Sequence, residues 1–586
     1  MSEPATPTPP GLFDGVLARG GVRDAVGDRA WLQAMLDVEA ALAHAQARAG
    51  LFPAAVADEI AHACRAEDFD IAALGRAATE TGNPVPALVR SLTARLPEPA
   101  AAQVHRGATS QDIVDTAAML IARRALVPLL ADLDGAADAA AALAATHRAT
   151  LMAGRTLLQQ ALPITFGLKA AGWLSGLDDA AARLGEIRRT RLAVQLGGAA
   201  GTLASLGVLG PAVVGHLGEE LELAVPLLPW HTTRGRVAEL AAALGIAAGA
   251  LGKPARDVTL LAQTEVGEVH EGAPPRSRDG SGGTRRGGSS ALPNKRNPIA
   301  AVSTVACAVR APGLVGTLLA AMLQEHERAA GAWHAEWMPL IDLLVAVGSA
   351  AAWLHDCLAH LEVDESRMRA NLASTGGLLM AERVTSALAP HLGRIAAHDL
   401  VAEVCAEAIE RRQPLADVLG ARPEVAARLS QLEINVLLDP SDYLGSAALF
   451  VDRALRAHAA RRGHEGRDMD PTVDRDPEGD RGGGAGRAQN GDGDAGGGRR
   501  LLDAAETDRL ELDEVGDKEE AGEDDGDGED EDGEDAGIED AGIEHEDGER
   551  AGDAAERAGD AAERARDPTE GAGGKGKGKG EPKGMP

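Results

Sequence analysis

The amino-acid sequence predicts an all-α fold with a long central helical bundle, followed by a disordered acidic tail. Along most of residues 1–462, apolar residues recur at the spacing of helix faces. The β-branched and aromatic runs that predict strands are nearly absent. The acidic residues are concentrated beyond residue 464, where the chain has no aromatic side chain. These three observations set the fold class, and each part of the chain can be taken in order.

Residues 1–110 predict an N-terminal domain of shorter helices interrupted by Pro and Gly. One of them, WLQAMLDVEAALAHAQARAG over residues 31–50, ends at a glycine, which commonly follows the last turn of a helix. Its apolar residues should lie along one side of the helix; they are Leu32, Met35, Leu36, Val38 and Leu42.

Residues 111–360 predict a central bundle domain of helices that are long for globular proteins. Its Ala- and Leu-rich segments are 112–150, 163–196, 237–268, 298–330 and 335–361. Several are apolar on more than one side, so they need a large mutual interface, which a helical bundle or an oligomer provides. A glycine-rich loop over residues 272–298 lies among them, and a C-terminal helical domain follows over residues 361–462.

Residues 463–586 predict a disordered, low-complexity acidic tail. Residues 465–586 hold 41 Asp plus Glu against 16 Lys plus Arg, a net charge of -25, which leaves residues 1–464 with a net charge of only -7. Low hydrophobicity combined with high like charge cannot bury enough apolar surface to offset chain entropy. We expect the tail to be a solvated appendage, with partner binding as the alternative.

Composition argues against several classes of protein. The acidic body and tail lack the basic face that nucleic-acid binding requires. The start, MSEPATPTPPG, has no apolar signal-peptide segment, and charges interrupt the apolar stretches, so we expect a cytoplasmic protein without membrane spans. The four cysteines are far apart and none stands at metal-ligand spacing, so we expect reduced thiols, no metal and no cofactor.

Four polar segments interrupt the apolar helices and hold the candidate site residues. They are GNPVP (82–86), HRGATSQDIVDTA (105–117), GRTLLQQALPITFG (154–167) and GGSSALPNKRNP (287–298). Each precedes a long predicted helix, whose N-terminus presents unpaired N–H groups and positive potential suited to a carboxylate. Taken singly, each also has a structural reading, such as a helix cap, a turn or a surface arginine.

Lysine usage singles out the fourth segment. Residues 1–464 contain only three lysines, and one of them, Lys295, lies in this segment beside Arg296. A compact ammonium group is suited to reaching a substrate carboxylate. The segment is therefore a candidate for a loop that carries chemistry, where composition alone also allows a slack linker.

Together, the four segments resemble the fumarase/aspartase superfamily, whose signature loop has the form GSSxMPxKxNP. In this chain the loop is GSSALPNKRNP over residues 288–298, with Leu292 where the superfamily usually has methionine. The resemblance covers about residues 12–460 and leaves the tail unmatched. It implies a three-section all-α fold and a homotetramer in which motifs from three subunits meet in each site.

Within the superfamily, GRTLLQQALPITFGLKAAGW, QTEVGEV and DPSDYLG resemble the bacterial 3-carboxy-cis,cis-muconate cycloisomerases. The implied reaction is the reversible lactonisation of a small tricarboxylate, 3-carboxy-cis,cis-muconate, to 4-carboxymuconolactone in protocatechuate breakdown toward β-ketoadipate. One alternative is an adenylosuccinate lyase-like β-elimination that releases fumarate; those lyases carry a histidine where this chain has Leu157 and another near Asn83. A non-catalytic helical protein is the third reading, which the intact signature loop disfavours.

The resemblance also implies roles for individual residues. Ser289 stands at the superfamily's acid/base position, where its hydroxyl depends on loop N–H groups and nearby positive charge to transfer a proton. Lys295 and Asn297 complete the predicted catalytic set, and preorganised donors stabilise the carbanion intermediate. The predicted substrate-binding residues are Asn83, Thr109, Ser110, Gln111, Arg155, Thr156, Gln159, Ser290 and Arg296. The candidates for a second proton donor are His105, His231 and His270.

Overall fold

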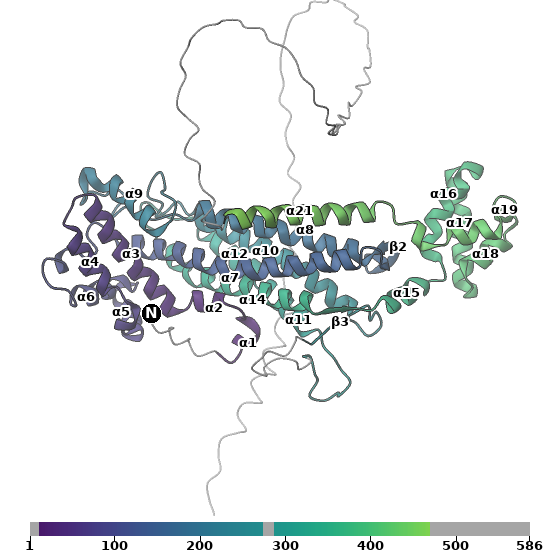
Figure 1. The fold of residues 1–586 in the computed structure, drawn as a ribbon, viewed down its shortest axis with the longest axis horizontal. Helices are drawn as coiled ribbons and strands as arrows, with labels where there is room; N and C mark the ends of the chain where they lie inside the picture. The colour runs from purple at the N-terminus through teal and green to yellow at the C-terminus, as the bar shows by residue number, and fades with distance from the viewer. Residues whose placement is uncertain (1–10, 274–285, 469–586) are drawn as a thin grey trace, which may run out of the picture. The chain divides into compact units, whose positions relative to one another are not determined.

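The computed structural model describes residues 11–273 and 286–468 (Figure 1). These residues form helices with only two short two-stranded sheets among them, so the all-α fold class predicted from the sequence is confirmed. The acidic tail beyond residue 468 and most of the lead-in to the signature loop lie outside the described residues.

The N-terminal part consists of short helices around one longer one, α3. Its helices are α1 (Asp14–Leu17), α2 (Val22–Ala25), α3 (Asp28–Arg48), α4 (Ala54–Ala63), α5 (Ile71–Thr81) and α6 (Val85–Thr93). The five apolar residues predicted to share one side of α3 are all buried. Gly50, just beyond its end, has a φ of 83°, a left-handed conformation that favours glycine. The predicted helix and its stop are confirmed.

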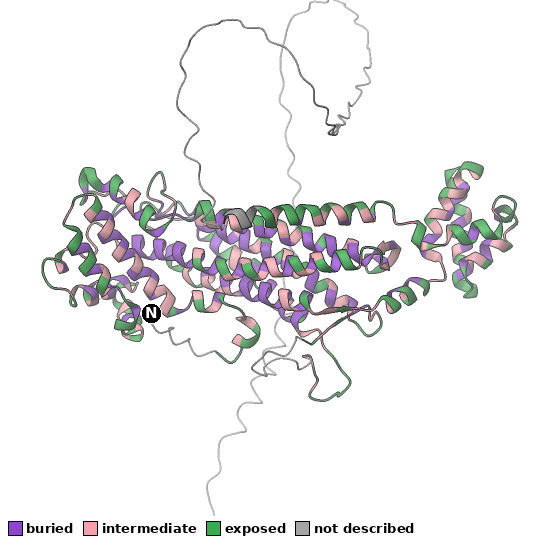
Figure 2. Cartoon of the chain, in the orientation of Figure 1, coloured by how far each residue is buried: buried purple, intermediate pink, exposed green. Residues whose placement is uncertain are grey.

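Long helices make up the central bundle, whose interior is buried (Figure 2). They are α7 (Ser110–Thr146), α8 (Phe166–Glu186), α10 (Gly235–Leu261) and α14 (Trp337–Ala359), with the shorter α9 (Gly210–Leu221), α11 (Ile299–Ala308), α12 (Ala311–Ala320) and α13 (Ala332–Ala335). α7 packs against α8 and α14, and α10 packs against α8, α11 and α14. One continuous apolar core joins these helices to the N-terminal ones.

The structure differs from two of the predicted helices. The segment 298–330 contains two helices, because Pro312 lies in the first turn of α12, where it lacks an N–H and cannot continue α11. The segment beginning at Gly154 does not enter a helix directly. It belongs to an antiparallel hairpin of β1 (Leu151–Thr156) and β2 (Gln159–Thr165), which precedes α8.

A second two-stranded sheet, formed by strands far apart in the sequence, leads into the signature loop. β3 (Val269–Glu271) pairs antiparallel with β4 (Leu361–Val363), which follows α14 directly. The chain enters the loop from β3 and leaves it into α11, which packs against α14. The end of α14 is therefore next to both ends of the loop.

The C-terminal helices have an apolar core of their own. They are α15 (Glu365–Ala373), α16 (Ala381–Leu392), α17 (Arg394–Arg411), α18 (Leu415–Ala421), α19 (Pro423–Ala426), α20 (Gln431–Leu437) and α21 (Ala447–Asp468). Helices α16 to α20 enclose this core, whereas α21 returns to pack along α8. The domain boundaries at residues 110, 360 and 462 remain predictions.

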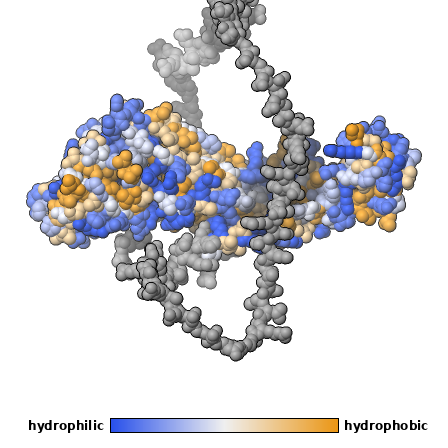
Figure 3. All heavy atoms as spheres, turned by 90° about the horizontal axis from the view of Figure 1, so that it is seen from above, coloured by the Kyte–Doolittle hydropathy of each residue, from blue (hydrophilic) through white to orange (hydrophobic). Residues whose placement is uncertain are grey.

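Several bundle helices are apolar on exposed sides. By length and composition alone, the segments Gly235–Leu261, Ile299–Ala320 and Ala332–Ala359 could cross a membrane. They pack instead into the bundle, the last with 72% of its most apolar window buried but the α11–α12 segment with only 39%. Exposed apolar residues include Val302 of α11, Val309 between the two helices and Leu319 of α12, and apolar residues also gather on the face seen in Figure 3. Exposed apolar sides of this kind are typical of surfaces that contact another protein chain.

Candidate active site

Asp112 fixes the start of α7. One of its carboxylate oxygens accepts the N–H of Thr109 at 2.9 Å, the arrangement of a capping box. The same carboxylate accepts the N–H groups of Gly197 and Gly198, both at 2.9 Å, and lies 2.7 Å from Nε2 of the buried His231. Asp112 thus ties the first turn of α7 to two other segments of the chain. His231, a candidate proton donor, is held by this carboxylate.

The side-chain amide of Gln111 makes all of its hydrogen bonds to other residues of the chain. Its amide nitrogen donates to the carbonyl of His231 at 2.8 Å and to Asp115 at 3.1 Å. Its amide oxygen accepts from Nη1 of Arg328 at 3.0 Å. Gln111 is buried, whereas the preceding Ser110 is half-buried. The structure therefore brings Thr109, Ser110, Gln111 and His231 together, with Gln111 holding the arrangement in place.

A buried ionic cluster lies one turn further along α7. Arg234 pairs with Asp115 at 2.8 Å and with Glu336 at 2.5 Å, and all three side chains are less than 5% exposed. The indole of Trp333 donates to Asp115 at 3.0 Å. Burial raises the pKa of Glu336, which the charge and hydrogen bonds of Arg234 only partly oppose. One cation thus serves two buried carboxylates.

His105 and Asn83 each have a partner within the chain. Nδ1 of His105 lies 2.7 Å from the buried Glu39. Burial lowers the pKa of His105, but its hydrogen bond to Glu39 and the charge of that carboxylate outweigh the effect, so the pKa is raised. The Asn83 side chain accepts the N–H of Val85 at 3.1 Å and so shapes the turn before α6.

Arg155, on β1, is paired with a buried carboxylate. Its two terminal nitrogens lie 2.9 and 2.7 Å from the oxygens of Glu268, which is fully buried and also accepts from Asn371 at 2.8 Å. This bidentate pair holds the guanidinium in one orientation and neutralises much of its charge. To bind a substrate carboxylate, Arg155 must use its remaining N–H groups or leave Glu268.

The tip of the β1–β2 hairpin is exposed. Thr156 and Gln159 pair across it in register and are both exposed. Between them, Leu157 and Leu158 are 97% and 73% exposed, with φ angles of 50° and 66°. Bulky side chains rarely adopt this left-handed conformation. The hairpin therefore presents two leucines outward, and the first of them, Leu157, is where the resemblance implies a histidine in the adenylosuccinate lyases.

The signature loop places two N–H groups on the Ser289 oxygen. Oγ of Ser289 accepts the N–H groups of Ala291 at 3.2 Å and Leu292 at 3.0 Å. Such donors stabilise an alkoxide in preference to the neutral hydroxyl. Ser289 is half-buried, whereas Ser290, Lys295 and Arg296 are exposed. The local geometry is thus suited to a serine that alternates between hydroxyl and alkoxide.

The base of the loop is closed by Asn297 and Glu271. The carbonyl of Gly287 accepts both the backbone N–H of Asn297 at 2.9 Å and its side-chain amide at 3.0 Å. Glu271, at the end of β3, accepts the first N–H groups of α11 from Ala300 and Ala301 at 3.0 and 2.8 Å. In this chain, the side-chain amide of Asn297 therefore joins the two ends of the loop. His270, in β3, is exposed.

One chain does not bring all the predicted site residues together. α7 has 37 residues, which at 1.5 Å per residue is about 55 Å. Thr109 and Ser110 lie at its start, whereas the β1–β2 hairpin follows its end, on the other side of the bundle (Figure 1). Arg155 lies near the entry to the signature loop, because its partner Glu268 directly precedes β3. The predicted residues thus form two separate groups.

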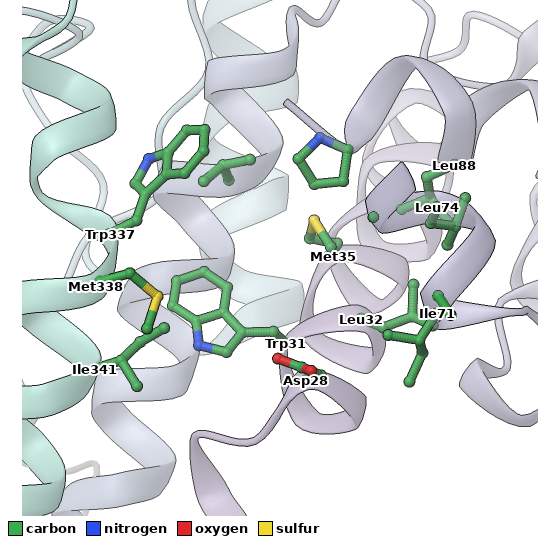
Figure 4. A pocket seen from close by; sticks show the side chains of 14 residues that line it. Asp28, Trp31, Leu32, Met35, Ile71, Leu74, Leu88, Trp337, Met338 and Ile341 are labelled. Carbon is green, nitrogen blue, oxygen red and sulfur yellow. The ribbon is translucent and has the colours of Figure 1, made fainter. Parts of the chain in front are cut away.

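A large cavity of about 590 Å³ lies between α3, α5 and α14 (Figure 4). Its walls are mostly apolar and include Trp31, Met35, Trp337, Met338 and Ile341. None of the predicted site residues lines it. Apolar walls cannot replace the hydration of three carboxylates, so this cavity is not the tricarboxylate site.

The sequence alone indicated the donors of the site but not their carboxylate partners. Glu39, Glu268 and Glu271 are not among the predicted site residues, although the segment QTEVGEV, which resembles the cycloisomerases, contains Glu268. Only the paired acids Asp112 and Asp115, three residues apart in TSQDIVDT, gave a local signal that one helix face is acidic. Among the described residues there is no group of three or more His, Cys, Asp or Glu side chains arranged to hold a metal ion.

Known proteins resemble most of the chain. The lyase family model matches residues 19–313, and the adenylosuccinate lyase C-terminus model matches residues 377–454. A 3-carboxy-cis,cis-muconate cycloisomerase from Bradyrhizobium diazoefficiens is 48% identical over 447 residues, 76% of this chain and 97% of its own. A nitrosuccinate lyase from Streptomyces davaonensis is 48% identical over 458 residues, 76% of this chain and 94% of its own.

The crystal structure of 3-carboxy-cis,cis-muconate lactonizing enzyme from Pseudomonas putida matches with a TM-score of 0.71 at 44% identity. That match covers 77% of this chain and 99% of the other. Residues 19–313, which the lyase family model matches, include the four polar segments. The chain therefore belongs to the lyase family, the fumarase/aspartase superfamily that its signature loop resembles.

Proposed function

We propose that the protein is a 3-carboxy-cis,cis-muconate cycloisomerase, which converts its substrate reversibly into 4-carboxymuconolactone. The observation that carries the proposal is the Ser289 oxygen, held by two loop N–H groups in a loop that also supplies a lysine. The similarity to cycloisomerases at 48% identity over nearly their whole length supports the same reaction. No cofactor is needed for it.

In the proposed mechanism, a substrate carboxylate adds to a conjugated double bond and the electrons move into the carboxylate next to the far carbon. The resulting carbanion is an aci-carboxylate, whose extra charge Lys295 and the α7 start can stabilise. Ser289 then gives its proton to that carbon and becomes an alkoxide, which accepts the N–H groups of Ala291 and Leu292. In the reverse direction the alkoxide removes the same proton and the C–O bond of the lactone breaks.

The hairpin tip favours this reaction over amine elimination. Releasing an amine requires a proton donor near the leaving nitrogen. The exposed tip presents Leu157 and Leu158, which cannot donate a proton. Elimination from nitrosuccinate is a second candidate, because a relative named for that activity matches this chain at the same identity.

We also propose that the protein is a cytoplasmic homotetramer with sites shared between subunits. The length of α7 keeps the two groups of site residues at opposite ends of one bundle, so a complete site requires another copy. The exposed apolar sides of α11 and α12 provide surfaces for such contacts. Light scattering coupled to gel filtration should give four times the mass of one chain, and a monomer with full turnover would contradict the shared site.

The proposed activity can be tested by following the loss of diene absorbance when the purified protein is mixed with 3-carboxy-cis,cis-muconate. We expect turnover with this substrate and none with adenylosuccinate. Nitrosuccinate should be tested in parallel, with fumarate formation as the readout. Turnover of nitrosuccinate alone would replace the cycloisomerase proposal with the lyase.

Gly287 offers a specific test of the loop geometry. Its φ is 80°, and a Cβ at this position would lie 2.0 Å from the carbonyl oxygen of Asn297. Gly287→Ala should therefore open the base of the loop and lower kcat/KM about a hundredfold, as expected when catalytic groups move by about 1 Å.

The neighbouring Gly288 provides a matched control. Its added Cβ would meet nothing within 4 Å, and its φ is not left-handed. Gly288→Ala should keep kcat/KM within a few-fold of the natural protein in the same diene assay. Equal activity of the two variants would show that closure of the loop base is not required.

A further inference from the structure

Asp356, near the end of α14, gathers several cationic groups outside the predicted site. Its carboxylate pairs with Arg19 at 2.8 Å and with Arg286, and it lies 3.0 Å from Nδ1 of His360. The side chain is only 11% exposed. The two guanidinium groups also lie over the same aromatic ring, with Arg19 and Arg286 4.0 and 5.5 Å from the centre of Trp353.

Arg286 links this cluster to the signature loop. It directly precedes Gly287, whose carbonyl receives both N–H groups of Asn297. Ser289 follows two residues later. The ion pair with Asp356 therefore fixes the backbone immediately before the closed base of the loop, at the end from which Ser289 is presented.

The next residue of α14 reaches the other end of the loop. The thiol of Cys357 lies 3.6 Å from Glu271, the carboxylate that caps α11 where the loop ends. α11 itself packs against α14. Adjacent residues of one helix, Asp356 and Cys357, thus contact groups that hold the two ends of the segment 286–300.

Charge balance makes Asp356 the critical member of the cluster. Both arginines use the same carboxylate oxygen, and without that negative charge two cations would remain next to the Trp353 ring without a counter-ion between them. The two guanidinium groups would then repel each other, and because both are partly buried, water and salt would screen this repulsion less than at the surface. We expect Arg286 to be displaced, because it belongs to the loop. The backbone of Arg19 is held in place, since its N–H donates to Oγ of Ser349 at 3.0 Å.

We propose that Asp356 is a positioning residue for the reaction. Through Arg286 it holds the entry to the signature loop in the conformation that presents Ser289 to the substrate. The proposal rests on the proposed acid/base function of Ser289. It assigns to the end of α14 a role in the orientation of the catalytic loop, not in contact with the substrate.

Hydrogen exchange of the loop amides tests the proposal without any substrate. In Asp356→Asn, the amides of residues 287–298 should exchange about tenfold faster, while those in the middle of α14 keep their protection. Asp132→Asn is the matched control, because Asp132 faces the adjacent His355 at 3.4 Å and does not contact the loop. Unchanged exchange in the loop, or equal loss of protection along α14, would overturn the proposal.

Kinetics supply the second readout. Asp356→Asn and Arg286→Met should each lower kcat about tenfold with a smaller change in KM, because a displaced loop misplaces Ser289. Arg19→Met removes a cation from the same carboxylate but leaves the loop attached, so its kcat should stay within about twofold of the natural protein. Asp356→Glu should recover part of the loss, and equal effects of the two arginine variants would contradict a loop-specific role.

The two readouts separate this proposal from the proposed function. If the natural protein does not act on 3-carboxy-cis,cis-muconate, the function fails, yet the exchange experiment still tests whether Asp356 holds the loop. If the protein is active and both Asp356→Asn and Arg286→Met retain full kcat, the positioning role fails and the function stands.

Discussion

Replacing Ser289 with alanine should lower kcat by about a thousandfold, while a product analogue binds nearly as tightly as before. General acid/base catalysis typically raises the rate of a reaction about a hundredfold to ten-thousandfold. Among the described residues of the signature loop, only Ser289 has a side chain that accepts two backbone N–H groups of the loop. Without the hydroxyl oxygen, those two N–H groups lose their acceptor and the carbanion has no adjacent proton source. The change should be measured as kcat in the diene assay and as the Kd of the product analogue by calorimetry.

Ser290→Ala provides the contrast. Ser290 is exposed and was predicted to bind substrate, so its loss should raise KM while most of kcat is retained. A fall of kcat only in Ser289→Ala would place the proton transfer at that oxygen. Near-normal turnover of Ser289→Ala would remove it from the mechanism and direct attention to His105 and His231.

The sequence predicted those parts of the fold that depend on local patterns. Helical periodicity located α3. The long Ala- and Leu-rich run located most of α7, whose residues 111–122 are all buried. The signature loop was found because its Ser, Pro, Lys and Asn-Pro spacing is specific. The break between α11 and α12 also had a local signal, Pro312, which the long apolar segment obscured.

The remaining features depend on contacts between distant parts of the chain. Glu268 is 113 residues from Arg155, and Arg234 is 119 residues from Asp115, so neither pair leaves a local pattern. The β1–β2 hairpin is not predicted, because β1 carries Met, Ala and Gly at its centre and not the β-branched residues typical of strands. Arg155 was predicted to bind substrate without the knowledge that a buried carboxylate already pairs with it.

Removing the cation of the buried cluster should cause a large loss of stability. Arg234→Met leaves Asp115 and Glu336 as two buried carboxylates without a counter-ion, and breaking such a pair typically costs about 3–5 kcal/mol. Chemical denaturation at fixed protein concentration measures the change. Arg236→Met is the control: Arg236 lies two residues later, inside α10, is only half-buried and donates to a backbone carbonyl, so its loss should cost less than about 1 kcal/mol.

The loss in Arg234→Met should also depend on pH in a defined direction. Burial already raises the pKa of Glu336, and without Arg234 nothing opposes that effect as strongly. A carboxyl group whose pKa is higher in the folded than in the unfolded state favours folding below its unfolded pKa and loses that contribution as the pH rises through its folded pKa. The deficit in the free energy of unfolding of the variant, relative to the natural protein, should therefore be larger at about pH 7.5 than at about pH 5.

Adding Glu336→Gln to Arg234→Met should remove part of this pH dependence. A deficit that is the same at both pH values would mean that the two carboxylates find other partners when Arg234 is gone, and that the cluster does not need its single cation to stay buried.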